Sequence, residues 1–172
     1  NHYSSARDLA TLSQKLISDF PVHYSMYKEK WFTYSDIKQR NRNSLLWQDE
    51  TVDGIKTGHT DNAGYCLVSS AKKNDTRLIA VTLNSSSERT RITDNRRLLD
   101  YGFRYFITKI VVNAGEKLTE KEVWGGQVEK VSLASATSLY LTLSPKDFKE
   151  VETFISLDNY LQAPLVKGQV VG

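Results

Sequence analysis

The chain has 172 residues, of which 40% are hydrophobic and 25% are charged, and its formal net charge is +3. These values are typical of a soluble globular protein with one domain, or with one domain and part of a second. Arginines cluster only between Arg89 and Arg97, no apolar run is long enough for a transmembrane helix, and Cys66 is the single cysteine. The composition therefore argues against a nucleic-acid partner, a membrane span and an intramolecular disulfide.

The first predicted element is a helix that begins near Ser5. The Ser5 hydroxyl can cap free backbone N–H groups, and the Asp8 carboxylate suits the positive end of a helix. Apolar residues then recur at helical spacing as far as Pro21, which ends the segment. Further along, aromatic and polar residues on both sides of Ser35-Asp36 predict a β-hairpin.

The middle of the chain predicts an antiparallel meander followed by a helix. Three strands are expected at 52–59, 65–71 and 77–83, joined by turns rich in Asp, Asn, Gly and Lys. The third strand contains Leu78-Ile79-Ala80-Val81, which indicates that both faces of the sheet are covered. Helical spacing returns over 92–107, with Ile92, Leu99, Phe103 and Phe106 on one side.

The character of the sequence changes after about Thr108. Gly and Pro punctuate short β-rich runs such as 128–133 and 138–143, which predicts an all-β second domain. We therefore divide the chain into 1–107 and 108–172. Because it begins without a methionine or signal peptide and ends on a strand-like run, we interpret it as a fragment whose second domain is incomplete.

Lys56-Thr57-Gly58 lies on the first strand of the meander and is the motif that carries chemistry. K-T-G belongs to the signature of penicillin-binding proteins and β-lactamases. A lysine supplies a fixed positive charge, a threonine hydroxyl can donate to a substrate carboxylate, and a glycine lets another backbone lie close to the strand. A peptide substrate could then add as an extra strand. Three residues alone are more typical of a solvated lysine at a strand end.

Longer stretches around the motif make the pattern specific. They are Tyr3-Ser4-Ser5-Ala6-Arg7-Asp8, Tyr27-Lys28-Glu29-Lys30, Asn41-Arg42-Asn43-Ser44-Leu45-Leu46-Trp47, Asp53-Gly54-Ile55-Lys56-Thr57-Gly58-His59-Thr60, Ala63-Gly64-Tyr65, Arg96-Arg97-Leu98-Leu99-Asp100-Tyr101-Gly102-Phe103 and Ala163-Pro164-Leu165. In order and over nearly the whole chain, they resemble the serine-type D-alanyl-D-alanine carboxypeptidases among the low-molecular-mass penicillin-binding proteins. The resemblance implies an α+β fold, an antiparallel sheet flanked by helices, without its N-terminal part and with a partial all-β second domain.

The resemblance also implies an activity and a site. Enzymes of this family form an acyl-enzyme on the serine of S-x-x-K, release the terminal D-alanine of a peptidoglycan stem pentapeptide and then hydrolyse the intermediate. β-Lactams acylate the same serine. Lys56 would bind substrate and organise the electrostatics, and Thr57, Gly58 and His59 would line the pocket. Arg91 would lie near the substrate carboxylate, with which a guanidinium forms charge-assisted pairs.

Two arginines and two serines have competing interpretations. Arg42 would lie at the pocket rim, although Arg42 and Arg91 are both compatible with ordinary surface arginines. Ser25-Met26-Tyr27-Lys28 and Ser70-Ala71-Lys72-Lys73 match S-x-x-K, but we interpret both as decoys, because the family's nucleophile lies far upstream of K-T-G at a helix start. No S-x-N precedes Lys56. The catalytic serine and its lysine are therefore expected in a missing N-terminal segment of the same protein.

The remaining features imply no cofactor and no metal, since the three histidines lack ligand spacing. Cys66 is predicted to be a small core residue. A β-lactamase-type hydrolase and a non-catalytic fragment that binds peptidoglycan peptides are the alternatives. From the resemblance we expect a periplasmic protein that acts on the cell wall and is held on the outer face of the inner membrane. The holding element would be a C-terminal helix that this chain lacks.

Overall fold

The computed structural model describes residues 3–157 and 160–171. They form two units, and the chain passes from one to the other between Tyr105 and Phe106. The first unit contains α1 (Ala6–Asp19), α2 (Pro21–Tyr24), η1 (Ser25–Lys28), β1 (Trp31–Tyr34), β2 (Ile37–Arg40), α3 (Leu45–Gln48), β3 (Val52–Thr60), β4 (Gly64–Lys73), β5 (Thr76–Ser85) and α4 (Glu88–Tyr105).

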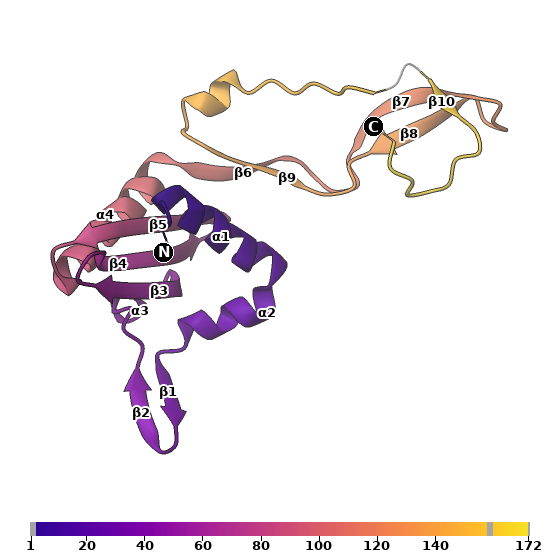
Figure 1. Ribbon diagram of the computed structural model, residues 1–172. Coiled ribbons are helices and arrows are strands. Elements are labelled where there is room, and N and C mark those ends of the chain that lie inside the picture. The colour runs from indigo at the N-terminus through magenta and orange to yellow at the C-terminus, as the bar shows by residue number, and fades with distance from the viewer. Residues whose placement is uncertain (1–2, 158–159, 172) are drawn as a thin grey trace. The chain divides into compact units, whose positions relative to one another are not determined.

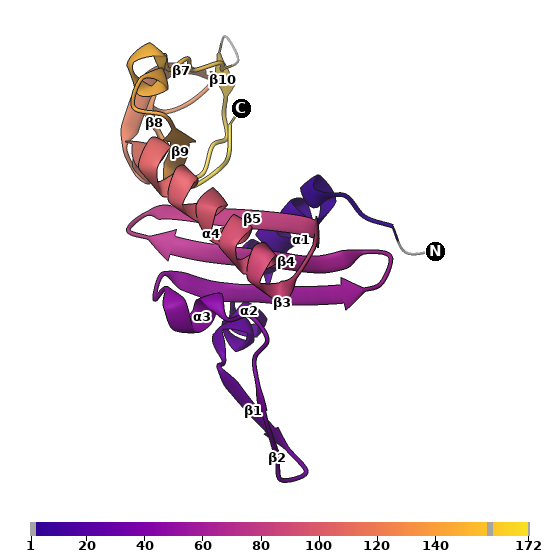
Figure 2. The ribbon, with the colours of Figure 1, turned by 90° about the vertical axis from the view of Figure 1, so that its left-hand side faces the viewer.

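An antiparallel sheet of order β3-β4-β5 is the centre of the first unit (Figure 1). This confirms the predicted meander. Figure 2 shows α4 crossing one face of the sheet, with α1 behind the opposite face. β3 lies at the edge, because β4 is its only strand neighbour among the described residues. The K-T-G motif is therefore on an edge strand.

Two apolar clusters hold the helices on the sheet. The cluster on the α4 side contains buried Leu45 and Leu67, and that on the α1 side contains Tyr24, Ile55 and Val68. The run Leu78–Val81 contributes alternately to both, since Leu78 and Ala80 pack on the first cluster and Ile79 and Val81 on the second. The prediction that both sheet faces are covered is thus confirmed.

Local sequence signals set the helix start and the hairpin as expected. Ser5 Oγ accepts from the Asp8 N–H at 3.2 Å, and the Asp8 carboxylate accepts from the Ser5 N–H at 2.9 Å. This reciprocal capping box begins α1. In the hairpin, Tyr34 pairs with Ile37, so Ser35 and Asp36 form a two-residue loop with φ of 47° and 61°. Such loops need positive φ to match the strand twist.

α4 begins at Glu88, four residues before the predicted start at Ile92. Ser87 caps it, because its Oγ accepts from the Thr90 N–H at 3.1 Å. The first turn is polar and shows no apolar periodicity, which is why spacing alone missed it. The helix also ends at Tyr105, so Phe106 lies outside it.

A buried asparagine fastens α4 to the sheet. Asn95 lies on the apolar side of the helix and is fully buried. Its Nδ2 donates to the carbonyls of Leu67 and Ala80, both at 3.2 Å, and its Oδ1 accepts from Ser69 Oγ. These bonds connect the helix with β4 and β5, so the position of α4 on the sheet depends on directional polar contacts as well as on packing.

A second polar cluster joins α2 to all three strands. Asp53 on β3 forms a bidentate ion pair with Arg77 on β5, at 2.9 and 2.7 Å, and accepts from Tyr24 Oη at 2.5 Å. Arg77 also donates to Ser70 on β4 at 2.7 Å. Burial, followed by the hydrogen bond to Asp53, raises the pKa of Tyr24 to about 12.

The second unit is β-rich, as predicted, and is described by itself. It contains β6 (Ile107–Val112), β7 (Lys117–Trp124), β8 (Lys130–Ala134), β9 (Leu139–Leu143), η2 (Asp147–Glu150) and β10 (Leu161–Gln162). β6 pairs with β9, and β7 lies between β10 and β8. The predicted strand runs 128–133 and 138–143 correspond to β8 and β9. None of the helices in the described parts of the chain is long and apolar enough to cross a membrane.

The raised pKa of Tyr24 predicts a loss of stability at high pH. The folded pKa of about 12 exceeds the ordinary value of 10.0, so the folded state keeps a proton that the unfolded state has lost. Below pH 10 the contribution of this group to the free energy of unfolding should hence be fully present and independent of pH. Between pH 10 and 12 the free energy of unfolding should fall by up to about 1.4 kcal/mol per pH unit. Urea unfolding from pH 9 to 12 measures this. Tyr24→Phe should lose the extra slope and exposed Tyr34→Phe should keep it; equal slopes in all three proteins would contradict the prediction.

Replacing Asn95 should destabilise the first unit. Asn95→Ala leaves the buried Ser69 hydroxyl and two strand carbonyls without their side-chain partner, which should cost about 2–4 kcal/mol. Thr93→Ala, an exposed change on the same helix, should stay within about 0.5 kcal/mol of the parent. Urea denaturation compares them, and similar midpoints for the two variants would argue against the role given to Asn95.

Candidate functional site

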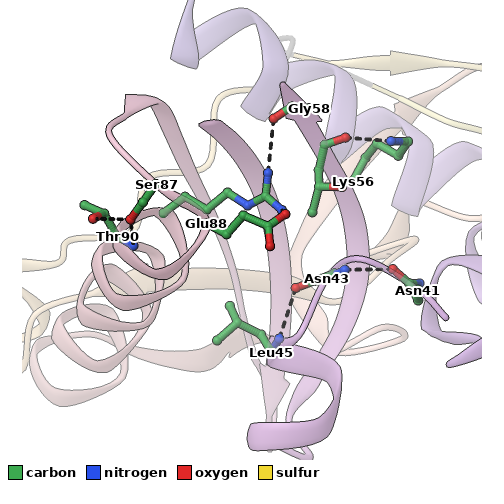
Figure 3. Close-up of polar contacts among 10 residues, drawn as sticks. Asn41, Asn43, Leu45, Lys56, Gly58, Ser87, Glu88 and Thr90 are labelled. Atoms are coloured by element: carbon green, nitrogen blue, oxygen red, sulfur yellow. Dashed lines mark hydrogen bonds and ion pairs between the residues drawn. The ribbon is translucent and has the colours of Figure 1, made fainter. Parts of the chain in front are cut away.

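The K-T-G segment lies along the edge of the sheet. Lys56 is exposed and its Nζ donates to the Thr57 carbonyl at 2.6 Å, while the Thr57 side chain is half-buried. Side chains from elsewhere hold β3 on both sides of Lys56. Asn43 Nδ2 donates to the Gly54 carbonyl at 3.0 Å. Arg91 Nη1 donates to the Gly58 carbonyl at 3.2 Å, the bond drawn to Gly58 in Figure 3. These bonds thus fix the segment in place, although β4 is its single strand neighbour in the described part of the chain.

Asn43 positions the start of this segment from inside the protein. It is fully buried, and its Oδ1 accepts from the Leu45 N–H at 3.2 Å at the start of α3. Its own N–H donates to Asn41 Oδ1 at 3.0 Å (Figure 3). Because one side chain connects α3 with Gly54, the loop before α3 and the edge strand are held as one structure.

Arg91 is a buried arginine, so its interpretation as an ordinary surface residue is wrong. Only 2% of the residue is exposed. Its Nη2 donates to Glu88 Oε1 at 3.0 Å, and its guanidinium lies over the Tyr65 ring at 5.5 Å. The ring of His59 lies 4.0 Å from the same Tyr65 ring. Tyr65 therefore connects His59 on β3 with Arg91 on α4.

A cleft of about 460 Å³ opens between the loop after β2 and the start of α4. Its lining residues are Arg40, Asn41, Arg42, Ser44, Gln48, Glu88, Arg89, Arg91, Ile92 and Thr93. The lining contains four arginines and a single carboxylate, which favours an anionic ligand. The structure thus brings Arg42, which is exposed, and Arg91 to one cleft. Lys56, Thr57 and His59 lie on β3, outside this lining.

In both S-x-x-K matches the serine hydroxyl is hydrogen-bonded to a group other than the lysine of the motif. Ser25 lies in η1, is exposed and donates to the Val22 carbonyl at 2.7 Å. Ser70 is fully buried on β4 and accepts from Arg77. Lys73 follows it on the same strand, where side chains three residues apart point to opposite faces.

Cys66 is not the core residue that we predicted. It is half-buried on β4, opposite Gly58 on β3, and its Sγ contacts the Ala63 carbonyl at 3.3 Å. The apolar neighbours Leu67 and Val68 suggested a core strand, but the buried part of β4 begins only after Cys66.

Within the described ranges, no group of three or more His, Cys, Asp or Glu side chains could hold a metal ion.

The sequence analysis missed Glu88, Tyr65 and Asn43 as individual contributors. Glu88 gave no signal, since a lone glutamate before an apolar stripe is common. Asn43 and Tyr65 lay within the stretches that resemble the family, but nothing local indicated what they contact. Their partners are Arg91 and Gly54, which only the folded chain places beside them.

Solved penicillin-binding proteins share this fold. A structure of penicillin-binding protein 5 from Haemophilus influenzae is 42% identical with a TM-score of 0.83, covering 100% of this chain and 51% of that chain. Penicillin-binding protein D2 from Listeria monocytogenes, in its cefotaxime-bound form, is 35% identical with a TM-score of 0.55, covering 58% of this chain and 41% of its own. The fold together with these identities places the chain among the penicillin-binding proteins.

Family comparisons give the narrower group. A family model for D-alanyl-D-alanine carboxypeptidase matches residues 1–87, and one for the penicillin-binding protein 5 C-terminal domain matches residues 106–172. D-alanyl-D-alanine carboxypeptidase DacA from Escherichia coli K12 is 44% identical over 172 residues, which is 99% of this chain and 43% of that protein. The chain belongs to the D-alanyl-D-alanine carboxypeptidase family. It spans less than half the length of the curated relatives that it matches.

An added methyl group should lower the stability of the protein at one glycine of β3 and have little effect at another. A Cβ on Gly54 would lie 2.9 Å from Tyr24 Oη, whereas a Cβ on Gly58 would meet only Cys66 Cβ at an ordinary 3.7 Å. Gly54→Ala should therefore cost about 1–3 kcal/mol, and Gly58→Ala should change stability by less than about 0.5 kcal/mol. Thermal or urea unfolding of the two variants checks this, and a strongly destabilised Gly58→Ala would show that the chain's own packing requires this glycine.

Proposed function

We propose that this chain forms the K-T-G side of the active site of a serine-type D-alanyl-D-alanine carboxypeptidase. The whole protein removes the terminal D-alanine from peptidoglycan stem pentapeptides through an acyl-serine intermediate and is inhibited by β-lactams. The observation that carries the proposal is the buried Arg91 guanidinium, bound to the Gly58 carbonyl at the end of the K-T-G segment and facing a cleft rich in arginine. Family membership supports the same reaction.

Each residue of the site has a role that its position supports. Lys56 is an exposed cation on the edge strand, so it stabilises negative charge on a bound acyl group. The Thr57 hydroxyl and the Arg91 guanidinium bind the terminal carboxylate of the substrate, and Arg42 attracts it from the rim of the cleft. The edge of β3 accepts the peptide backbone as an added strand, which Gly58 allows at close range.

The nucleophile comes from a segment of the same protein outside this chain. The Ser25 hydroxyl donates to the Val22 carbonyl, and buried Ser70 and Lys73 point to opposite faces of β4, so we assign the activated serine to neither. The protein acts on the cell wall in a bacterial periplasm. It is held at the inner membrane by a C-terminal segment outside this chain, and it thereby contributes to cell shape.

A β-lactamase-type hydrolase is the alternative within the same fold. The second unit favours the carboxypeptidase, because its 67 residues match the family model for the penicillin-binding protein 5 C-terminal domain. A non-catalytic module that binds peptidoglycan peptides is the alternative outside enzymology. It describes the 172-residue chain by itself, which has the β3 edge and the arginine-rich cleft but no activated serine.

Benzylpenicillin distinguishes these functions. The full-length protein that carries this sequence should gain the mass of one benzylpenicillin in an intact-mass spectrum, and it should release D-alanine from a stem pentapeptide. The 172-residue chain should show neither effect. Rapid loss of the adduct with fast turnover of benzylpenicillin would support the β-lactamase instead.

Two outcomes would overturn the proposal. A full-length protein that is folded but neither acylated nor able to release D-alanine would leave the binding module as the function. An adduct on the isolated chain would place a nucleophile within it, and comparison of Ser25→Ala with Ser70→Ala would identify which serine is modified.

A further inference from the structure

Glu88 holds the guanidinium that faces the cleft, and the two side chains differ sharply in exposure. Glu88 is the first residue of α4, and its Oε1 accepts from Arg91 Nη2 at 3.0 Å, one turn further along (Figure 3). The Glu88 side chain is 68% exposed, whereas that of Arg91 is 3% exposed. The guanidinium is therefore fixed by the fold, while its carboxylate partner can swing into solvent without unpacking anything.

The bond to Glu88 leaves one N–H donor of the Arg91 guanidinium without a partner in the described part of the chain. Arg91 Nη1 is bound to the Gly58 carbonyl and Nη2 to Glu88, but Nε is a buried nitrogen without a hydrogen-bond partner within the described residues. Glu88 thus makes a single hydrogen bond. A carboxylate placed on the same edge of the guanidinium can accept from both Nη2 and Nε, because arginine and carboxylate match in a bidentate fork. A carboxylate that displaces Glu88 can hence replace the bond to Nη2, and it reaches the buried Nε only where the departure of Glu88 uncovers that nitrogen.

The charges around the cleft also favour a carboxylate ligand. Its lining residues include Arg40, Arg42, Arg89 and Arg91, and Glu88 is the carboxylate among them. A ligand with a free carboxylate is attracted by four guanidinium groups and repelled by one acidic side chain. That acidic side chain also occupies the buried arginine that the ligand would bind.

We infer that Glu88 competes with the terminal carboxylate of the substrate for Arg91 and so sets the affinity of the site for carboxylate ligands. The inference rests on the proposed function, since it assigns Arg91 to that carboxylate. Only the Glu88 side of the pair is exposed, so its single bond to Arg91 is weak and Glu88 is displaced readily, but until then it occupies Arg91. When only a fraction of molecules can bind, the apparent affinity falls by that fraction. Release of Glu88 should tighten carboxylate binding about two- to fivefold.

The test uses the full-length protein that carries this sequence and a pair of ligands that differ only in the carboxylate. The second-order rate constant of acylation is measured with benzylpenicillin and with its methyl ester. Glu88→Gln should raise the rate constant for benzylpenicillin about two- to fivefold and leave that for the ester unchanged. Glu88→Asp keeps the charge but withdraws the carboxylate by one methylene, so it should behave like Glu88→Gln.

A matched control comes from the same helix. Asp94 forms an i,i+3 pair with Arg97 at 3.5 Å, as Glu88 does with Arg91, but lies outside the cleft lining. Asp94→Asn removes the same charge and should change neither rate constant. Measurements repeated at about 0.5 M salt screen the long-range attraction of charges, so an effect of contact should persist there.

The outcomes separate this inference from the proposed function. A parent protein that benzylpenicillin does not acylate would refute the proposed function itself. A parent that is acylated normally, with Glu88→Gln unchanged, slower, or equally faster with the ester, would overturn the role of Glu88 alone. A Glu88→Asp variant that matches the parent, or an Asp94→Asn variant that matches Glu88→Gln, would likewise overturn it, because the effect would then come from charge and not from contact.

Discussion

The candidate site depends on the hydrogen bonds of the buried Arg91 guanidinium. A cation out of water is costly unless its hydrogen bonds are met, and here the Gly58 carbonyl and the Glu88 carboxylate meet two of them. The same bonds tie the first turn of α4 to the end of the K-T-G segment. Asn95, one turn further along α4, binds carbonyls of β4 and β5. The helix, the sheet and the cleft are thereby fixed relative to one another within the first unit.

β3 has a single strand neighbour among the described residues, so side chains must hold its free edge in place. Asn43 holds the Gly54 carbonyl, Arg91 holds the Gly58 carbonyl, and the ion pair of Asp53 with Arg77 anchors the strand before the motif. These contacts leave the Lys56 side chain exposed. The same arrangement explains why Gly58 faces no close contact inside the chain, whereas Gly54 lies directly against Tyr24.

The arginine-rich cleft and the K-T-G segment are connected through Arg91 and differ in their chemistry. The cleft presents four guanidinium groups, and the edge strand presents main-chain groups, a hydroxyl and an ammonium. Neither part can break a bond without a nucleophile. The carboxypeptidase, the β-lactamase and the peptide-binding module therefore share this half of the site, and they differ in what the rest of the protein adds.

The sequence by itself determined the features that depend on neighbouring residues. The Ser5 capping box, the hairpin loop at Ser35-Asp36 and the three-strand meander follow from preferences that act over a few residues, and the family was evident from stretches read in order. Only the tertiary structure decided that Arg91 is buried, that Cys66 is not, and that Glu88 belongs to the cleft. Arg91 meets the Gly58 carbonyl across 33 positions of sequence, and such a contact exists only once the sheet and α4 have packed together.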